Sequence, residues 1–228
     1  MSEPIGFGPK TKKFLRALGR NNDKAWFDSH RREYEAYYLA PAKAFVEAVG
    51  PKLEKLSPNI VWEPRVNGSI FRVNRDIRFS KDKTPYKAYL HMLFQPRDAD
   101  NAPKWFFGLE PDKLVLGAGI FGFEKGVIDR YRKRVAGPDG KALAKQLEKM
   151  RKAGIRIREP ELKRVPSGFD ADLPHAELLR HKGLTAWMDL PGGPAAAAKP
   201  TIVSASAAGF KTLKPLFAWL SALDDAHA

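Results

Sequence analysis

Cationic side chains and two carboxylates are most densely spaced between residues 71 and 87, in the run Phe-Arg-Val-Asn-Arg-Asp-Ile-Arg-Phe-Ser-Lys-Asp-Lys-Thr-Pro-Tyr-Lys. If residues 71–79 form a strand, alternation sends every second side chain to the same face, about 7 Å apart. One face then carries Arg72, Asn74, Asp76 and Arg78, and the other turns Phe71, Val73, Ile77 and Phe79 to the core with Arg75 among them. At this spacing Asp76 can pair with Arg72 or with Arg78.

This segment has the chemistry of an anion site. Guanidinium forks and ammonium groups suit phosphate and carboxylate groups, and the hydroxyls of Ser80 and Thr84 can complete such a pocket. We therefore predict a site for an anionic small molecule or a phosphate-bearing ligand, with the ligand-binding residues Arg72, Arg75, Arg78, Lys83 and Tyr86. Asp76 is the candidate catalytic residue, which either orients an arginine or takes a proton as a general base. The sequence identifies neither the ligand nor a reaction, so whether the protein is an enzyme stays open.

Two other interpretations use the same side chains. They can form a structural ion-pair network that closes the edge of a sheet, or they can lie on a solvated, charged hairpin. A buried Arg75 favours the network, because a buried charge requires partners.

The pattern Arg72-x-x-Arg75-Asp76-x-Arg78-Phe79-x-x-x-Lys83-x-Pro85-Tyr86 resembles the signature of a bacterial and fungal family known as domain of unknown function 2461. Further similarities cover most of the chain: Asn21-Asn22 with Trp26-Phe27, Tyr34-Glu35, the turn at residues 108–111 and the run at residues 164–169. The Ala-rich stretch near residue 195 and the Lys24-Ala25 pair depart from it locally. The resemblance implies a similar α+β fold and a shared motif, with no activity to carry over.

A second basic region follows the expected sheet, between residues 130 and 164. On the helix expected from Lys141, the residues Lys141, Lys145, Lys149 and Lys152 recur at spacings of four, four and three. They form one cationic stripe opposite the apolar Leu143, Leu147 and Met150. A phosphate backbone matches such a stripe, so a nucleic-acid-binding module is the alternative function, and a solvated helix face is the simpler explanation.

Patterns for other chemistry are missing. No two of the five histidines have the i, i+4 spacing of a helical zinc site, and the surrounding lysines and arginines oppose cation binding by Asp76 and Asp82. We predict no tightly bound metal and no cofactor. The chain has no Gly-x-Ser-x-Gly and no phosphate-binding loop, and Gly117-x-Gly119-x-x-Gly122 fits a dinucleotide fingerprint poorly. These glycines instead suggest a bulge or a close approach of backbone or ligand.

Helical periodicity dominates both ends of the chain. We expect helices at residues 11–18, 24–39 and 41–56, and again at 125–135, 141–153 and 207–223, with a short helix within 175–188. Between them, residues 69–79, 86–94, 105–109 and 114–120 alternate as strands do, and the last two flank a turn and predict a hairpin. The expected fold class is α+β: N-terminal helices, a central antiparallel sheet of three to five strands with a hairpin, and C-terminal helices.

Composition limits the class of protein. The 228 residues suit a single domain, 1–228, with a helical part at 11–57, a sheet at 62–122 and a second helical part at 124–224. The absence of cysteine and of a signal-peptide profile predicts a cytoplasmic protein, and no apolar run approaches the roughly 20 residues that cross a bilayer, so no membrane partner is expected. A net charge of +14 and a pI near 9.9 favour anionic partners. No oligomeric state is predicted.

Overall fold

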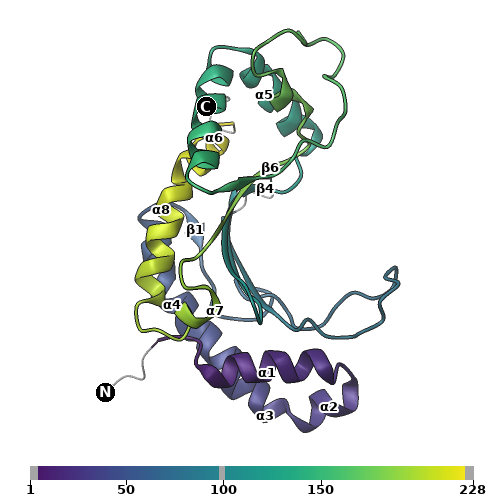
Figure 1. Ribbon diagram of the computed structural model, residues 1–228, viewed down its shortest axis with the longest axis vertical. Helices are drawn as coiled ribbons and strands as arrows, with labels where there is room; N and C mark the ends of the chain where they lie inside the picture. Colours follow the sequence, from purple (N-terminus) through teal and green to yellow (C-terminus); the bar gives the residue numbers. More distant parts are fainter. Residues whose placement is uncertain (1–4, 98–100, 224–228) are drawn as a thin grey trace. The chain divides into compact units, whose positions relative to one another are not determined.

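The computed structural model describes residues 5–97 and 101–223, and it confirms the α+β class (Figure 1). Six strands form an antiparallel sheet in the order β1-β2-β3-β4-β6-β5. Its strands are β1 (Ile60–Val61), β2 (Leu90–Pro96), β3 (Lys104–Leu109), β4 (Leu114–Ile120), β5 (Arg156–Ile157) and β6 (Leu184–Asp189). In the described residues no helix is both long and apolar enough to cross a membrane.

The chain divides into two compact units. The first contains residues 5–94, 106–116 and 189–209, and the second contains residues 95–97, 101–105, 117–188 and 210–223. Five elements, β2, β3, β4, β6 and α8 (Ile202–Ser221), contribute residues to both units. The expectation of a single domain stays a prediction.

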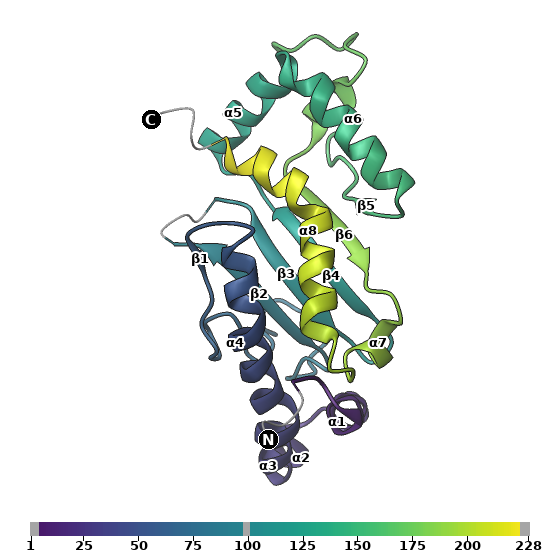
Figure 2. The same ribbon diagram turned by 90° about the vertical axis from the view of Figure 1, so that its left-hand side faces the viewer.

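The helices of the first unit are α1 (Pro9–Arg20), α2 (Lys24–Ser29), α3 (Arg31–Tyr34), the π-helical turn η1 (Glu35–Leu39), α4 (Ala40–Glu54) and the short α7 (Gly193–Ala196). Where one helix was expected over 24–39, the chain turns at His30, so that α2 and α3 are separate. The carboxylate of Asp23 caps α2 by accepting from the N–H of Trp26 at 2.8 Å. Figure 2 shows α4 running along β1 and β2. Phe45, Val49 and Leu53 of α4 are fully buried.

The helices of the second unit are α5 (Lys125–Ala136), α6 (Asp139–Lys152), the 3₁₀ turn η2 (Ala176–Arg180) and the C-terminal part of α8. Strand β4 runs very close to β6: a Cβ on Gly119 would lie 2.1 Å from the carbonyl oxygen of Leu184, and Gly119 has a φ of +135°. At Gly119 the expected close approach is therefore an approach of backbone, which only a residue without a side chain permits. A Cβ on Gly117 would instead meet the ring of Trp187 at 2.7 Å, and a Cβ on Gly122 would meet nothing within 4 Å. The sequence predicted none of β1, β5 and β6, so the sheet has six strands where three to five were expected.

The strand expected at residues 69–79 is wrong in detail. Residues 69–75 and 85–93 pair as an irregular ribbon with single bridges, through Phe71 N to His91 O at 3.1 Å, Lys87 N to Val73 O at 2.8 Å and Arg75 N to Pro85 O at 2.8 Å. Between the Phe71–His91 bond and the Val73–Lys87 bond, the first arm advances by two residues and the second arm by four. The surplus residues bulge out and interrupt the regular ladder. We call residues 71–87 the motif ribbon, and in Figure 1 it extends away from the sheet.

Candidate functional site

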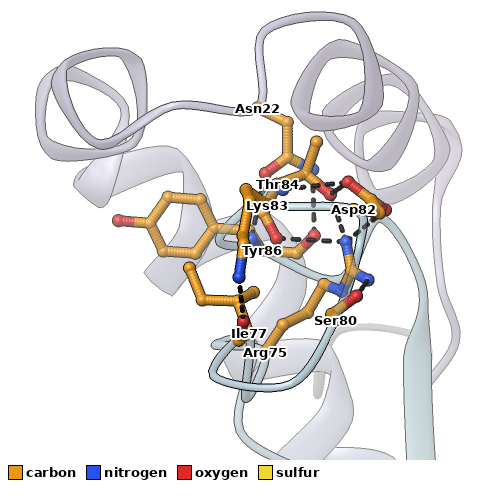
Figure 3. A network of polar contacts seen from close by, with 8 residues as sticks. All are labelled: Asn22, Arg75, Ile77, Ser80, Asp82, Lys83, Thr84 and Tyr86. Carbon is orange, nitrogen blue, oxygen red and sulfur yellow. Dashed lines mark hydrogen bonds and ion pairs between the residues drawn. The ribbon is translucent and has the colours of Figure 1, made fainter.

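The motif ribbon is attached to the N-terminal helices at Tyr86. The side-chain amide of Asn22 donates to the carbonyl of Tyr86 at 2.9 Å, and its oxygen accepts from the N–H of Tyr86 at 2.9 Å (Figure 3). The Tyr86 ring, which is buried, stacks on Phe27 with 4.3 Å between ring centroids. Tyr86 was predicted as a ligand residue, and the structure shows it packed between these two partners.

Arg75 lies inside the loop of the ribbon, with 25% of its side chain exposed. Its Nη1 contacts Asp82 Oδ2 at 2.5 Å and the carbonyl of Thr84 at 3.1 Å, and it also donates to the Thr84 hydroxyl (Figure 3). Its Nη2 reaches Ser80 Oγ at 3.5 Å. These contacts close the segment from Arg75 to Thr84 around one guanidinium, as the ion-pair-network interpretation expects.

Asp82 completes this loop from the opposite side. Its Oδ1 accepts from the N–H of Thr84 at 2.9 Å and from the Thr84 hydroxyl at 2.8 Å. The backbone and side-chain hydrogen bonds from Thr84, followed by the one from Arg75, lower the pKa of Asp82 to about 2. Because each donor favours the charged form, the carboxylate is ionised at neutral pH and fully used within the loop.

Asp76 forms a second ion pair on the exposed face. Its Oδ1 accepts from Arg78 Nε at 3.0 Å and from the N–H of Arg78 at 3.2 Å, and its Oδ2 accepts from Nη2 at 2.7 Å. Hydrogen bonds from the Arg78 side chain lower the pKa of Asp76 below its usual value. A carboxylate held in this way orients the arginine and is a weaker proton acceptor than a free aspartate. Of the two roles predicted for Asp76, the geometry matches the orientation of an arginine.

The remaining cations of the ribbon have no carboxylate partner in the described chain. Lys83 Nζ donates to the carbonyl of Ile77 at 3.0 Å, and Lys87 Nζ donates to the carbonyl of Arg72 at 3.0 Å. Burial and the charge of Arg72 lower the pKa of Lys87. The side chains of Arg72 and Lys81 are exposed and make no hydrogen bond or ion pair within residues 5–97 and 101–223.

The predicted alternation places most of these side chains correctly. Arg72, Asn74, Asp76 and Arg78 are all exposed, and Val73 between them is buried. Phe79 is the error: it was expected in the core, but it is 95% exposed at the turn of the ribbon, with the Arg78 guanidinium 5.9 Å from its ring centroid. The strand pattern ends before Phe79, so alternation no longer applies there.

His91, at the base of the ribbon, was not among the predicted site residues. Its ring stacks on Tyr89 at 4.0 Å and meets the edge of Phe106 at 4.8 Å. Burial, with a smaller effect of Lys87, lowers the pKa of His91 to about 4. The contact between Nε2 and Glu110 Oε1, at 3.5 Å, therefore joins a neutral imidazole to a carboxylate at neutral pH. Only its position on a strand flanked by aromatic residues could have indicated this burial.

In the second basic region some cations bind carbonyl or carboxylate groups of the described chain, and others have no acidic partner there. Arg130 donates to the carbonyl of Leu223 at 2.8 Å, Arg132 donates to that of Leu179 at 3.2 Å, and Arg134 pairs with Asp139 at 2.7 Å. On α6 the predicted faces are present, with Leu143, Leu147 and Met150 buried and the four lysines of the stripe exposed. Lys152 pairs with Glu148 at 3.3 Å, whereas Lys141, Lys145 and Lys149 have no acidic partner in the described chain.

Comparison with protein families gives one result. The family model described as "Conserved hypothetical protein (DUF2461)" matches residues 10–219. Neither the curated proteins nor the solved structures contain a significant match to the chain. In the described residues, no three His, Asp or Glu side chains group as a metal ion would require.

Proposed function

The chain belongs to the conserved hypothetical protein family DUF2461, and we propose that it binds a phosphate-bearing or carboxylate-bearing small molecule through the motif ribbon. One observation carries the proposal: of the six cations in residues 71–87, only Arg75 and Arg78 have a carboxylate partner among the described residues. The ribbon therefore has a net charge of +4 that the surrounding described chain does not neutralise.

The paired residues give this surface its shape. The Arg75–Asp82–Thr84 contacts hold the loop closed, and Asn22 fixes its C-terminal arm at Tyr86. The free cations Arg72 and Lys81 then project from a braced segment, so that binding an anion orders fewer side chains than it would on a flexible loop. Arg78, held by Asp76, adds a guanidinium of fixed orientation.

Neutralising the two free cations tests this proposal. We expect the Arg72→Ala/Lys81→Ala variant to bind inorganic phosphate and pyrophosphate at least about tenfold more weakly than the wild type, since each lost charge-assisted hydrogen bond contributes about 1.5–3 kcal/mol. Binding is measured by isothermal titration calorimetry at low salt.

The control is Lys52→Ala/Lys55→Ala, which removes two exposed lysines at the end of α4. It lowers the net charge by the same amount as Arg72→Ala/Lys81→Ala but leaves the ribbon intact. Equal weakening in both double variants would show that only the overall charge attracts the anion, and the ribbon would then not be the site.

A second candidate function rests on α6. The free ammonium groups of Lys141, Lys145 and Lys149 are spaced one helical turn apart along an exposed face, a geometry that suits a phosphate backbone. For this function we propose that the stripe binds nucleic acid without reading its sequence.

The salt dependence of binding separates the two functions. If α6 binds nucleic acid, the affinity for a fluorescent oligonucleotide falls steeply with salt, and Lys141→Ala/Lys145→Ala/Lys149→Ala lowers the slope of log K against log [salt] by about 2 to 3. An unchanged slope in this variant would remove α6 from consideration. The Arg72→Ala/Lys81→Ala variant is the matched comparison, because its charges lie outside the stripe.

A further inference from the structure

A separate pocket of about 430 Å³ lies among the N-terminal helices of the first unit. Its walls come from α1, α2, α3 and η1, and its lining is Lys10, Lys13, Phe14, Ala17, Trp26, His30, Glu33 and Tyr37. This volume falls within the range of about 300–1,000 Å³ that is typical of small-molecule sites. None of the residues that carry the proposed function lines it.

Aromatic rings form much of the pocket surface. Phe14 is almost fully buried and lies 5.9 Å from Trp26 between ring centroids. The indole of Trp26 stacks on His30 at 4.0 Å, with only 14° between the planes. Trp26 and Tyr37 themselves are only partly buried. The pocket therefore offers flat, partly exposed ring surface of the kind on which a planar ligand stacks.

Opposite charges stand on different helices around these rings. Lys10 and Lys13 are one turn apart on α1, and Lys10 Nζ lies 3.5 Å from the hydroxyl of Tyr37. Glu33 belongs to α3. Neither Lys13 nor Glu33 makes a hydrogen bond or an ion pair with the described part of the chain.

His30 adds an acceptor to the lining. Its Nδ1 lies 2.8 Å from the carbonyl oxygen of Trp26, which can only accept, so Nδ1 carries the proton. When the ring carries no second proton, Nε2 is an acceptor. The lining thus combines two ammonium groups with the carboxylate of Glu33 and the ring of His30.

We propose that this pocket binds a planar aromatic ring that carries an N–H or amino donor and one phosphate or carboxylate group. The ring stacks against Trp26, the anionic group binds the ammonium groups of Lys10 and Lys13, and N–H or amino groups of the ring donate to Glu33. An ordinary apolar ligand would leave both lysines and the carboxylate unmatched. A plain anion would leave Glu33 and the rings without a contact.

Calorimetric titration of the full chain with four probes tests the proposal. Guanosine 5′-monophosphate and 2-aminobenzoate each combine a ring, a donor and an anionic group, whereas guanosine lacks the anion and inorganic phosphate lacks the ring. We expect one or both of the first two to bind saturably, and guanosine and phosphate to bind this pocket at least about tenfold more weakly. Which of the two binds separates phosphate from carboxylate as the anionic group.

Two variants assign the binding to the pocket. Lys13→Ala is expected to weaken the ring-bearing anion about tenfold, and Glu33→Gln is expected to weaken it several-fold. Lys12→Ala, on the same helix but outside the lining, removes the same charge and is expected to have little effect.

Three results would overturn the proposal: no saturable binding of either ring-bearing anion up to about 10 mM, binding of inorganic phosphate as tight as that of guanosine 5′-monophosphate in the Arg72→Ala/Lys81→Ala background, or equal losses in the Lys12 and Lys13 variants. Failure here leaves the ribbon proposal standing, because the two sites share no residue.

Discussion

Removing the side chain of Asn22 tests whether it holds the motif ribbon in place. The neighbouring bonds, from Arg75 N to Pro85 O and from Lys87 N to Val73 O, leave the N–H and the C=O of Tyr86 directed away from the opposite arm, and Asn22 binds both at 2.9 Å. Each of these hydrogen bonds contributes about 1 kcal/mol, and a partly buried group that loses its partner costs more. We therefore expect Asn22→Ala to lower the free energy of unfolding by about 2–3 kcal/mol.

Urea denaturation followed by tryptophan fluorescence measures this loss. Asn21→Ala is the matched control, because the exposed side chain of Asn21 makes one local bond, to the carbonyl of Ala17 at 2.9 Å, and its loss should cost at most about 1 kcal/mol. Asn22→Asp keeps an acceptor for the Tyr86 N–H but directs a carboxylate at the Tyr86 carbonyl, so we expect it to be destabilising as well. If Asn22→Ala lowered the free energy of unfolding no more than Asn21→Ala, the ribbon would not depend on the two hydrogen bonds between Asn22 and Tyr86.

Three further predictions concern stability. The folded-state pKa of His91, about 4, lies below the ordinary 6.5, so the unfolded chain binds a proton more readily between these two pH values. The free energy of unfolding should therefore fall by about 3 kcal/mol as the pH is lowered from 6.5 to 4. If the wild type and His91→Phe lost the same stability over this range in denaturation curves, His91 would not be the cause. Gly50→Ala should destabilise the protein by about 1–3 kcal/mol, because the new Cβ would lie 2.3 Å from the ring of Trp62. Gly19→Ala should instead stabilise α1 by about 0.5–1 kcal/mol, because the nearest atom to its Cβ lies at 3.4 Å. Melting temperatures that shift in the same direction in both variants would contradict this. Phe79→Ser should change the free energy of unfolding by less than about 0.5 kcal/mol, since the ring is 95% exposed, and a large loss in urea denaturation would show that the ring packs in solution.

Much of the fold could be predicted because several elements carry a clear period of their own. The helices α4, α5 and α6 begin and end within a few residues of the predicted bounds, and the hairpin of β3 and β4 flanks the expected turn. Strand β6 was missed because Leu184–Asp189 is short and lies where a helix was expected, and its pairing with β5 is a contact over many residues. The break at His30 was missed because the aromatic spacing from 24 to 39 remains helical on both sides of it.

The candidate site was predictable only in its local part. Alternation identified the exposed face of the ribbon and allowed the pair of Asp76 and Arg78, which are two residues apart. It could not show that Arg75 pairs with Asp82, because that contact depends on how the turn folds back. The hydrogen bonds between Asn22 and Tyr86 join residues that are 64 positions apart, and no local sequence period predicts a contact over such a separation.

The division of the ribbon's cations into paired and free bears on how an anion would bind. An incoming phosphate that took Arg75 would have to displace Asp82, a carboxylate whose pKa is already lowered to about 2 by three donors. Displacing it would open the loop and leave the hydrogen bonds of Thr84 to be remade. Arg72 and Lys81 carry no such cost, because they have no partner to give up in the described chain. If the ribbon binds an anion as proposed, the geometry therefore favours binding to the outer cations with the Arg75–Asp82 pair left intact. Bracing and binding would then be performed by different residues of the same motif.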